Sequence, residues 1–184
     1  MPWFRKTAPA DPLAVSMTGV KLGDRVLVIG AGDPALIAAL GAKAGLTGTT
    51  CGVDSDESRV EHARHAVERE GVLADFTRAP LSMLPYDDAS FDIVVIRDAL
   101  PSLAPEDRMR CLRETRRVLR TGGRVMVIET AARAGIAVLI SRRTMNEHYV
   151  KTGGAKRALE AERFLAVRVL AEREGLVFVE GAKR

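Results

Sequence analysis

The chain has 184 residues, 47% of them hydrophobic and 28% charged, which is enough for one domain with a full hydrophobic core. This composition excludes an intrinsically disordered chain, and the longest apolar runs are far too short to cross a bilayer. The net charge of +4 is spread over arginine-rich segments without a basic cluster that includes aromatic residues, so nucleic acid is not indicated as a partner.

The first residues and the two cysteines indicate the cellular setting. Residues 1–6 lack the apolar core of a signal peptide, so we expect a cytoplasmic protein. Cys51 and Cys111 have no pairing pattern and no neighbouring histidine. We therefore expect buried free thiols and no metal site.

The N-terminal half alternates strands and helices. Residues 1–20 contain three prolines and a short expected helix over 13–17. We expect this segment either to lie over the sheet or to cover a ligand cleft, and a single domain to follow over 21–184. Further expected elements are a buried strand over 25–29, a helix from Pro34 to about Ala44, a strand over 49–53 and a helix over 57–70. Gly45 and Gly71 are expected to end the two longer helices.

The C-terminal half continues the alternation and ends differently. Strands are expected over 72–77, 91–96 and 124–129, with an amphipathic helix over 106–120, then helices over 131–143 and 156–162, and a hairpin of 164–173 with 176–180. This order predicts an α/β fold with a mostly parallel sheet and one antiparallel strand.

A glycine turn and a carboxylate form the first candidate ligand site. Gly30-x-Gly32 follows the first strand, and Asp54 follows the second. The glycines allow close approach of the backbone to a ligand, and a carboxylate at a strand end can accept hydrogen bonds from a ribose diol. The alternative is that Asp54 caps the helix that begins after Ser55. Taken alone, the pattern also fits a dinucleotide cofactor.

Two later segments resemble those of class I S-adenosylmethionine-dependent methyltransferases. They are Leu84-Pro-Tyr-Asp-Asp-Ala-Ser-Phe-Asp-Ile-Val-Val-Ile96 and Arg117-Val-Leu-Arg-Thr-Gly-Gly-Arg-Val-Met-Val-Ile128. The resemblance runs from about Gly19 to Glu129. It implies a doubly wound, Rossmann-like sheet of seven strands with helices on both faces, completed by the C-terminal antiparallel hairpin, and S-adenosylmethionine as the cofactor.

The resemblance also implies roles for individual residues. The expected cofactor contacts are Gly30, Ala31 and Gly32 at the methionine part, Asp54 at the ribose, Ser55, Pro80 and Leu81 at the adenine, and the Arg97 main chain at the amino-acid end. Three departures from the family's pattern stand out: Val28 replaces an acidic residue, Pro34 replaces the third glycine, and Ala79-Pro80 replace Gly-Asp.

Methyl transfer depends mainly on positioning and has no obligatory acid or base. If the acceptor must lose a proton, Asp98 is the first candidate base, followed by His148 and Tyr149.

The acceptor region is short. The first twenty residues and residues 131–154, the expected substrate cover, contain few aromatics, which favours a small-molecule acceptor, and an apolar one in particular. Two alternatives stay open. One is a binding or partner protein that has kept the fold and lost turnover, and the other is an NAD(P)-dependent oxidoreductase.

Overall fold

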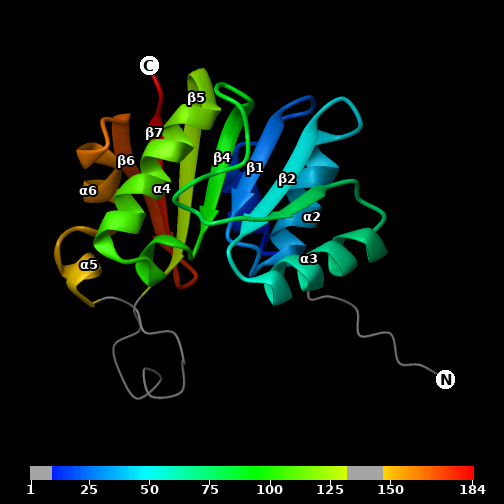
Figure 1. Ribbon diagram of the computed structural model, residues 1–184, viewed down its shortest axis with the longest axis horizontal. Helices are drawn as coiled ribbons and strands as arrows, with labels where there is room; N and C mark the ends of the chain where they lie inside the picture. The colour runs from blue at the N-terminus through cyan, green and yellow to red at the C-terminus, as the bar shows by residue number, and fades with distance from the viewer. Residues whose placement is uncertain (1–9, 132–146) are drawn as a thin grey trace.

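The computed structural model describes residues 10–131 and 147–184, which contain a seven-stranded sheet flanked by helices (Figure 1). The strands are β1 (Arg25–Ile29), β2 (Thr49–Asp54), β3 (Asp75–Arg78), β4 (Phe91–Arg97), β5 (Leu119–Thr130), β6 (Leu165–Arg173) and β7 (Leu176–Ala182). The helices are α1 (Pro12–Thr18), α2 (Pro34–Ala44), α3 (Glu57–Arg69), the 3-10 turn η1 (Leu100–Ser102), α4 (Pro105–Val118), α5 (Glu147–Lys151) and α6 (Gly154–Ala161).

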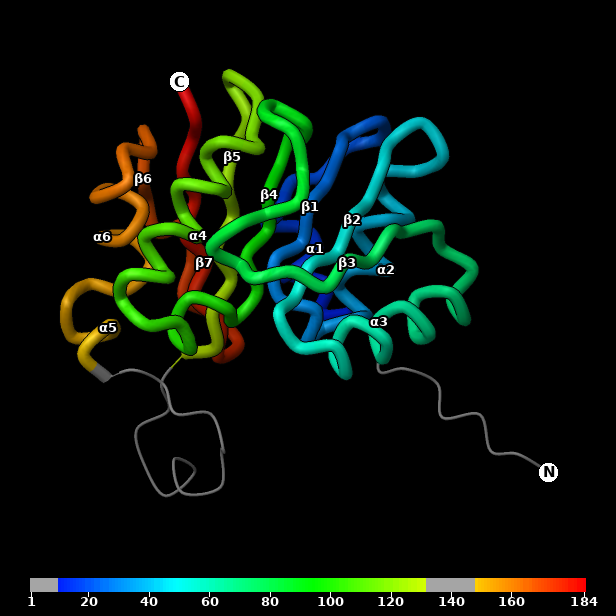
Figure 2. Tube along the Cα trace, viewed as in Figure 1, coloured from blue at the N-terminus to red at the C-terminus, as the bar shows by residue number. Residues whose placement is uncertain are grey.

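The strand order is β3-β2-β1-β4-β5-β7-β6. The first five strands are parallel, whereas β7 runs antiparallel to both β5 and β6. Figure 2 shows β1 and β4 side by side at the centre, although Val26 and its partner Ile93 are far apart in sequence. The predicted doubly wound sheet with its C-terminal hairpin is confirmed.

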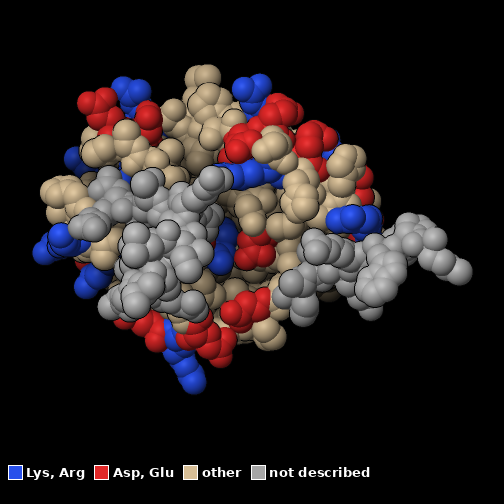
Figure 3. All heavy atoms as spheres, turned by 90° about the horizontal axis from the view of Figure 1, so that it is seen from below, with Lys and Arg blue, Asp and Glu red and all other residues tan. Residues whose placement is uncertain are grey.

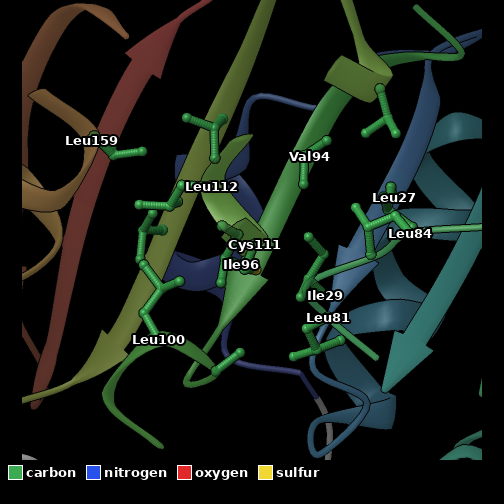
Figure 4. Packing of buried hydrophobic residues seen from close by; sticks show 14 of the residues in the cluster. Leu27, Ile29, Leu81, Leu84, Val94, Ile96, Leu100, Cys111, Leu112 and Leu159 are labelled. Atoms are coloured by element: carbon green, nitrogen blue, oxygen red, sulfur yellow. The ribbon is translucent and has the colours of Figure 1, made fainter. Parts of the chain in front are cut away.

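Alternate residues of β1 divide the core between the two faces of the sheet. Val26 and Val28 belong to the core cluster that contains residues of α1, α2 and α3, whereas Leu27 and Ile29 belong to the one that contains residues of α4, α5 and α6. Figure 4 shows the second face, where side chains of β1, β4 and α4 fill the space around Ile96. A parallel strand buried on both faces requires the continuous aliphatic run that the sequence shows here.

Helix ends follow local chemistry. Pro34 is the first residue of α2, where its missing N–H leaves no helical bond unmade, and the Asp33 carboxylate accepts a hydrogen bond from the Leu36 N–H at 3.1 Å. Gly45 and Gly71 follow the ends of α2 and α3 with φ values of 67° and 71°. These ends lie within a residue or two of their predicted positions.

Several boundaries differ from the prediction, most clearly the starts of β3 and of β5. β3 begins at Asp75 rather than at residue 72, because its pairing with β2 starts where Asp75 meets Cys51. Helix α4 ends at Val118 rather than at residue 120, and the strand that follows begins at Leu119, which already pairs with Phe91. The helix expected over 131–143 lies outside the described residues, except for Ala131. In the described part of the chain, every helix is too short or too polar to span a bilayer.

Candidate cofactor and catalytic site

The carboxyl edge of the sheet, defined here by Ile29, Asp54, Arg97 and Thr130 at the ends of β1, β2, β4 and β5, carries the predicted site. The connection after β1 passes over one face of the sheet and the connection after β4 passes over the other. Ligands of open α/β sheets bind outside such a reversal point. Figure 3 looks onto this edge, where acidic and basic side chains lie next to one another near the middle of the face.

Gly30 brings the loop after β1 against β4. Its φ is 95°, and a Cβ atom at this position would lie 2.5 Å from the Arg97 carbonyl oxygen. The Gly30 N–H donates to the Val53 carbonyl at 2.9 Å. Only glycine combines this backbone conformation with such a close approach. Ala31 is buried directly after it, and Gly32 is exposed.

Asp54 ties the same loop to β2. Its Oδ2 accepts from the Ala31 N–H at 2.9 Å and its Oδ1 from the Asp56 N–H at 3.0 Å. Arg59 Nη1 lies 3.7 Å from Oδ2. A carboxylate offers about four lone-pair positions, so each oxygen can still accept a bond from a hydroxyl. Asp54 does not cap the following helix. The N-cap of α3 is Asp56, whose side chain accepts a hydrogen bond from the Ser58 N–H at 2.9 Å.

The residues predicted around the adenine lie next to Asp54 and differ in exposure. The Ala79 N–H donates to the Asp54 carbonyl at 3.1 Å, which brings the loop after β3 back to the carboxyl edge. Ser55 and Pro80 are exposed there, whereas Leu81 is 6% exposed and belongs to the core. An adenine contact by Leu81 remains a prediction.

Arg97 links three elements at this edge. Its Nε lies 3.1 Å from Asp33 Oδ2 at the start of α2, and its Nη1 donates to Asp98 Oδ2. Asp98 has a φ of 50°, and its carboxylate also accepts from the N–H of Thr130 at 2.6 Å and from the Thr130 hydroxyl at 2.8 Å. The first candidate base is therefore held by β4 and β5 through bonds to both of its oxygens.

Glu129 is a further carboxylate at the edge that the sequence did not single out. Its Oε1 accepts from the Tyr149 hydroxyl at 2.8 Å. Burial raises the pKa of Glu129, and the charge of Asp98 adds to this effect. The hydrogen bond from Tyr149 and the charge of Arg108 oppose it, which leaves a pKa of about 7.

The other two predicted bases lie in different surroundings. Tyr149 is 3% exposed, and burial together with the charge of Glu129 raises its pKa far above the usual value. It therefore keeps its proton at neutral pH and acts as a donor. His148, the neighbouring residue, is exposed.

One cavity lies away from the carboxyl edge, and a second includes Tyr149 and Arg108 in its lining. The larger, of about 600 Å³, lies by the end of the sheet at which the parallel strands begin, and includes Arg113, Arg163 and Lys183 in its lining. The smaller, of about 220 Å³, lies on the outer side of α4 and includes Met109 and Arg157. Neither includes a predicted cofactor contact.

The two cysteines and the possible metal ligands offer no further reactive group among the described residues. Cys111 is buried and Cys51 is partly exposed, and burial raises their pKa values to about 12 and about 11. Neither is a thiolate at neutral pH. Among residues 10–131 and 147–184, no three His, Cys, Asp or Glu side chains are grouped so as to hold a metal ion.

A family model described as a methyltransferase domain matches residues 27–127, more than half of the chain, from β1 into β5. The chain belongs to this methyltransferase family. Membership confirms the predicted class, the S-adenosylmethionine-dependent methyltransferases, with S-adenosylmethionine as the cofactor. Asp54, which the matched range contains, fits such a ligand, because its carboxylate retains acceptor positions for a diol.

Curated relatives match a little under two thirds of this chain. The ubiquinone/menaquinone biosynthesis C-methyltransferase UbiE of Hydrogenovibrio crunogenus is 33% identical over 118 residues, covering 63% of this chain and 46% of that protein. UbiE of Cupriavidus necator is 31% identical over 115 residues, covering 62% and 46%. The chain thus matches about half the length of these relatives.

Solved structures support the fold. A SAM dependent methyltransferase from Aquifex aeolicus aligns with a TM-score of 0.76 at 19% identity, covering 92% of this chain and 87% of that one. The [4+2]-cyclase SpnF aligns with a TM-score of 0.68 at 18% identity, covering 93% and 78%. Because the name of the second protein states a cyclisation, the methyltransferase fold does not by itself determine the reaction.

Proposed function

We propose that this protein transfers the methyl group of S-adenosylmethionine to a small, apolar acceptor, and that the acceptor is a quinone-related ring methylated at carbon. The observation that carries the proposal is the joining of the Gly30 turn to the Asp54 carboxylate across the reversal point of the sheet. The names of the UbiE relatives support the choice of acceptor.

In this proposal, different residues of the carboxyl edge contact different parts of the cofactor. Asp54 accepts hydrogen bonds from the ribose hydroxyls, Ser55 and Pro80 flank the adenine, and the Gly30-Ala31-Gly32 turn lies against the methionine part. Val28 is 1% exposed and packs in the core, so it offers nothing to the amino group of the cofactor. Asp33, with its carboxylate partly exposed beside Arg97, supplies a negative charge near the turn instead.

The cofactor supplies a methyl group already activated by its sulfonium. The protein's part is to hold that carbon in line with the acceptor atom, which can account for much of the rate enhancement.

Calorimetric titration of the whole chain with S-adenosylmethionine, S-adenosylhomocysteine, NADH and NADPH tests the binding step. We expect the two adenosyl ligands to bind with Kd values below millimolar. Asp54→Asn should weaken them by about 10- to 100-fold, since a hydrogen bond to a charged group contributes about 1.5–3 kcal/mol. Asp75→Asn, at the exposed start of β3, is the matched control and should change Kd less than twofold. Thermal melts check that both variants fold.

Transfer is tested with a water-soluble hydroquinone that has an unsubstituted ring carbon, by the mass gain of one CH₂. A catechol that can gain the methyl group on oxygen serves as the comparison. Tight adenosyl binding without transfer to any acceptor would favour the non-catalytic binding protein. Binding of NADPH without adenosyl ligands would contradict the proposal.

A further inference from the structure

Glu129 and Asp98 lie next to each other at the carboxyl edge and on the same face of the sheet. Arg97 pairs with Ile128 in the register of β4 and β5, so the following residues, Asp98 and Glu129, are neighbours. Glu129 follows Val127 by two positions, and Val127 faces α4, α5 and α6. The Glu129 carboxylate therefore lies between the end of β4 and the helices of that face.

Among residues 10–131 and 147–184, Glu129 accepts one hydrogen bond and forms no ion pair, and the charge of Arg108 favours its ionisation. Tyr149 donates to Oε1, whereas Oε2 accepts no hydrogen bond from the described residues. Arg108 stacks on the Tyr149 ring at 4.1 Å from its centroid and donates to the carbonyls of Leu100 and Leu103 at 2.9 and 2.8 Å. Glu129 forms no ion pair within the described ranges, so burial and the Asp98 charge oppose its ionisation with little compensation.

Asp98 differs from Glu129 in this respect. Both of its oxygens accept hydrogen bonds, and Arg97 forms an ion pair with it. These contacts occupy lone pairs on both oxygens, so Asp98 has fewer acceptor positions left for a ligand. Oε2 of Glu129, at the same edge, accepts no hydrogen bond from the part of the chain that the structure describes.

We propose that Glu129 is the proton acceptor of the reaction and that Tyr149 is the positioning residue that orients its carboxylate. The acceptor atom forms its bond to the methyl carbon while the carbon–sulfur bond breaks, and that electron pair remains on sulfur. The proton carried by the acceptor atom passes to Oε2 of Glu129 and then to water. The inference rests on the proposed function and adds the residue that removes the proton.

The ionisation of Glu129 is measured first, in the protein without any ligand. NMR of protein labelled with ¹³C at glutamate Cδ should show one carboxyl that titrates near pH 7, well above the usual value of about 4.3. That resonance should be absent from Glu129→Gln and present in Glu172→Gln, a matched change at an exposed position of β6. Titration of Glu129 near pH 4.3 would overturn the proposal.

Tyr149→Phe tests the positioning role. Because the hydrogen bond from Tyr149 favours the carboxylate form, its loss should raise the midpoint of the Glu129 resonance above that of the parent protein. The rise of kcat/KM with pH should move to higher pH by the same amount. An unchanged midpoint would assign Tyr149 to packing alone and would contradict its role here.

Transfer and binding are then compared in the same variants. Glu129→Gln should lose about 10²- to 10⁴-fold in kcat, the usual contribution of a general base, while S-adenosylhomocysteine binds within twofold of the parent. Glu129→Asp should keep part of the parent's kcat, and the control Glu172→Gln should keep all of it. A Glu129→Gln variant that transfers within threefold of the parent would exclude Glu129 as proton acceptor, although methyl transfer itself would stand. Failure of the parent to bind adenosyl ligands would instead contradict the proposed function.

Discussion

Gly30 combines two demands that a side chain cannot meet, a positive φ and contact with the Arg97 carbonyl oxygen. We expect Gly30→Ala to lower the free energy of unfolding by about 2–4 kcal/mol, from backbone strain of about 1–3 kcal/mol plus the displacement of β4. Gly71→Ala is the matched control, because Gly71 has a φ of 71° and no atom within 4 Å of an added Cβ. The loss of unfolding free energy in Gly71→Ala should reflect the backbone strain alone.

Urea denaturation of both glycine variants measures the difference. Equal losses at the two positions would mean that the contact with Arg97 adds nothing. A larger loss in Gly30→Ala, together with weaker S-adenosylhomocysteine binding, would show that the turn supports both the fold and the site.

Glu129 should lower stability where it is ionised. Its pKa is raised in the folded chain from 4.5 to about 7, so the folded state binds the proton more tightly than the unfolded state. The stabilisation is complete below pH 4.5 and is lost as the pH rises to about 7. One unit of pKa corresponds to about 1.4 kcal/mol. Between pH 4 and pH 8 the parent should therefore lose about 1–3 kcal/mol of stability relative to Glu129→Gln.

Thermal melts of the parent and Glu129→Gln at pH 4, 6 and 8 check this expectation, with Glu172→Gln as control. Because Gln keeps an oxygen for the Tyr149 hydroxyl, the comparison changes the charge and little else. A stability difference that does not vary with pH would show that Glu129 has an ordinary pKa.

Three strands meet at Asp92 near the start of β4, at the edge opposite to the site. The carboxylate accepts from the Arg25 N–H at 2.8 Å on β1 and from Arg120 Nε on β5. Burial alone would raise the pKa of Asp92, but the hydrogen bonds from Arg120 and Arg25 outweigh it and lower the pKa to about 2. This carboxylate stabilises the pairing of the central strands.

Asp92→Asn should therefore lower the free energy of unfolding by about 1 kcal/mol at pH 7, a value reduced for screening by solvent. The folded pKa is depressed, so the contribution of Asp92 is present above about pH 4 and is lost as the pH falls to about 2. Urea denaturation at pH 7 and pH 3 measures the change, with Asp75→Asn as control. A deficit that stays constant between these pH values would point to lost packing rather than lost charge.

Elements formed by neighbouring residues could be predicted from the sequence. The aliphatic run of β1, the glycine that follows it and Pro34 at the start of α2 act within a few residues of one another, so their pattern determines the local structure. The start of β5 was missed, because Leu119 becomes strand by pairing with Phe91, a contact that no local pattern shows.

The candidate site could be predicted only in part for the same reason. Asp54 stands at a strand end beside a glycine turn, and this arrangement is visible in the sequence. Glu129 and Tyr149 are 20 residues apart and meet only when α5 packs on the end of β5. Tyr149 was proposed as a base, but burial makes it a donor to the carboxylate that the sequence had not marked. The sequence feature that could have identified Glu129 is an acidic residue near the end of a buried strand.

In the whole molecule, the parallel strands and the C-terminal hairpin have different roles. The five parallel strands carry the proposed cofactor contacts and the reversal point, and β7 of the hairpin pairs with the side of β5 that faces away from β4. Glu129 pairs with Val177 of β7, so the C-terminal segment supports the strand that carries the proposed proton acceptor.

The place of β7 beside β5 also affects how the protein is made. At translation rates of about 5–20 residues per second, several seconds pass between synthesis of Thr130 and of Ala182, the last residue of β7. During that interval the hydrogen-bonding groups on the β7-facing side of β5 lack the neighbour that they have in the finished sheet, and unpaired strand edges of this kind promote association between chains. The nascent chain therefore keeps this unpaired strand edge until β7 is made, and chaperones that hold nascent chains should reduce aggregation during that interval.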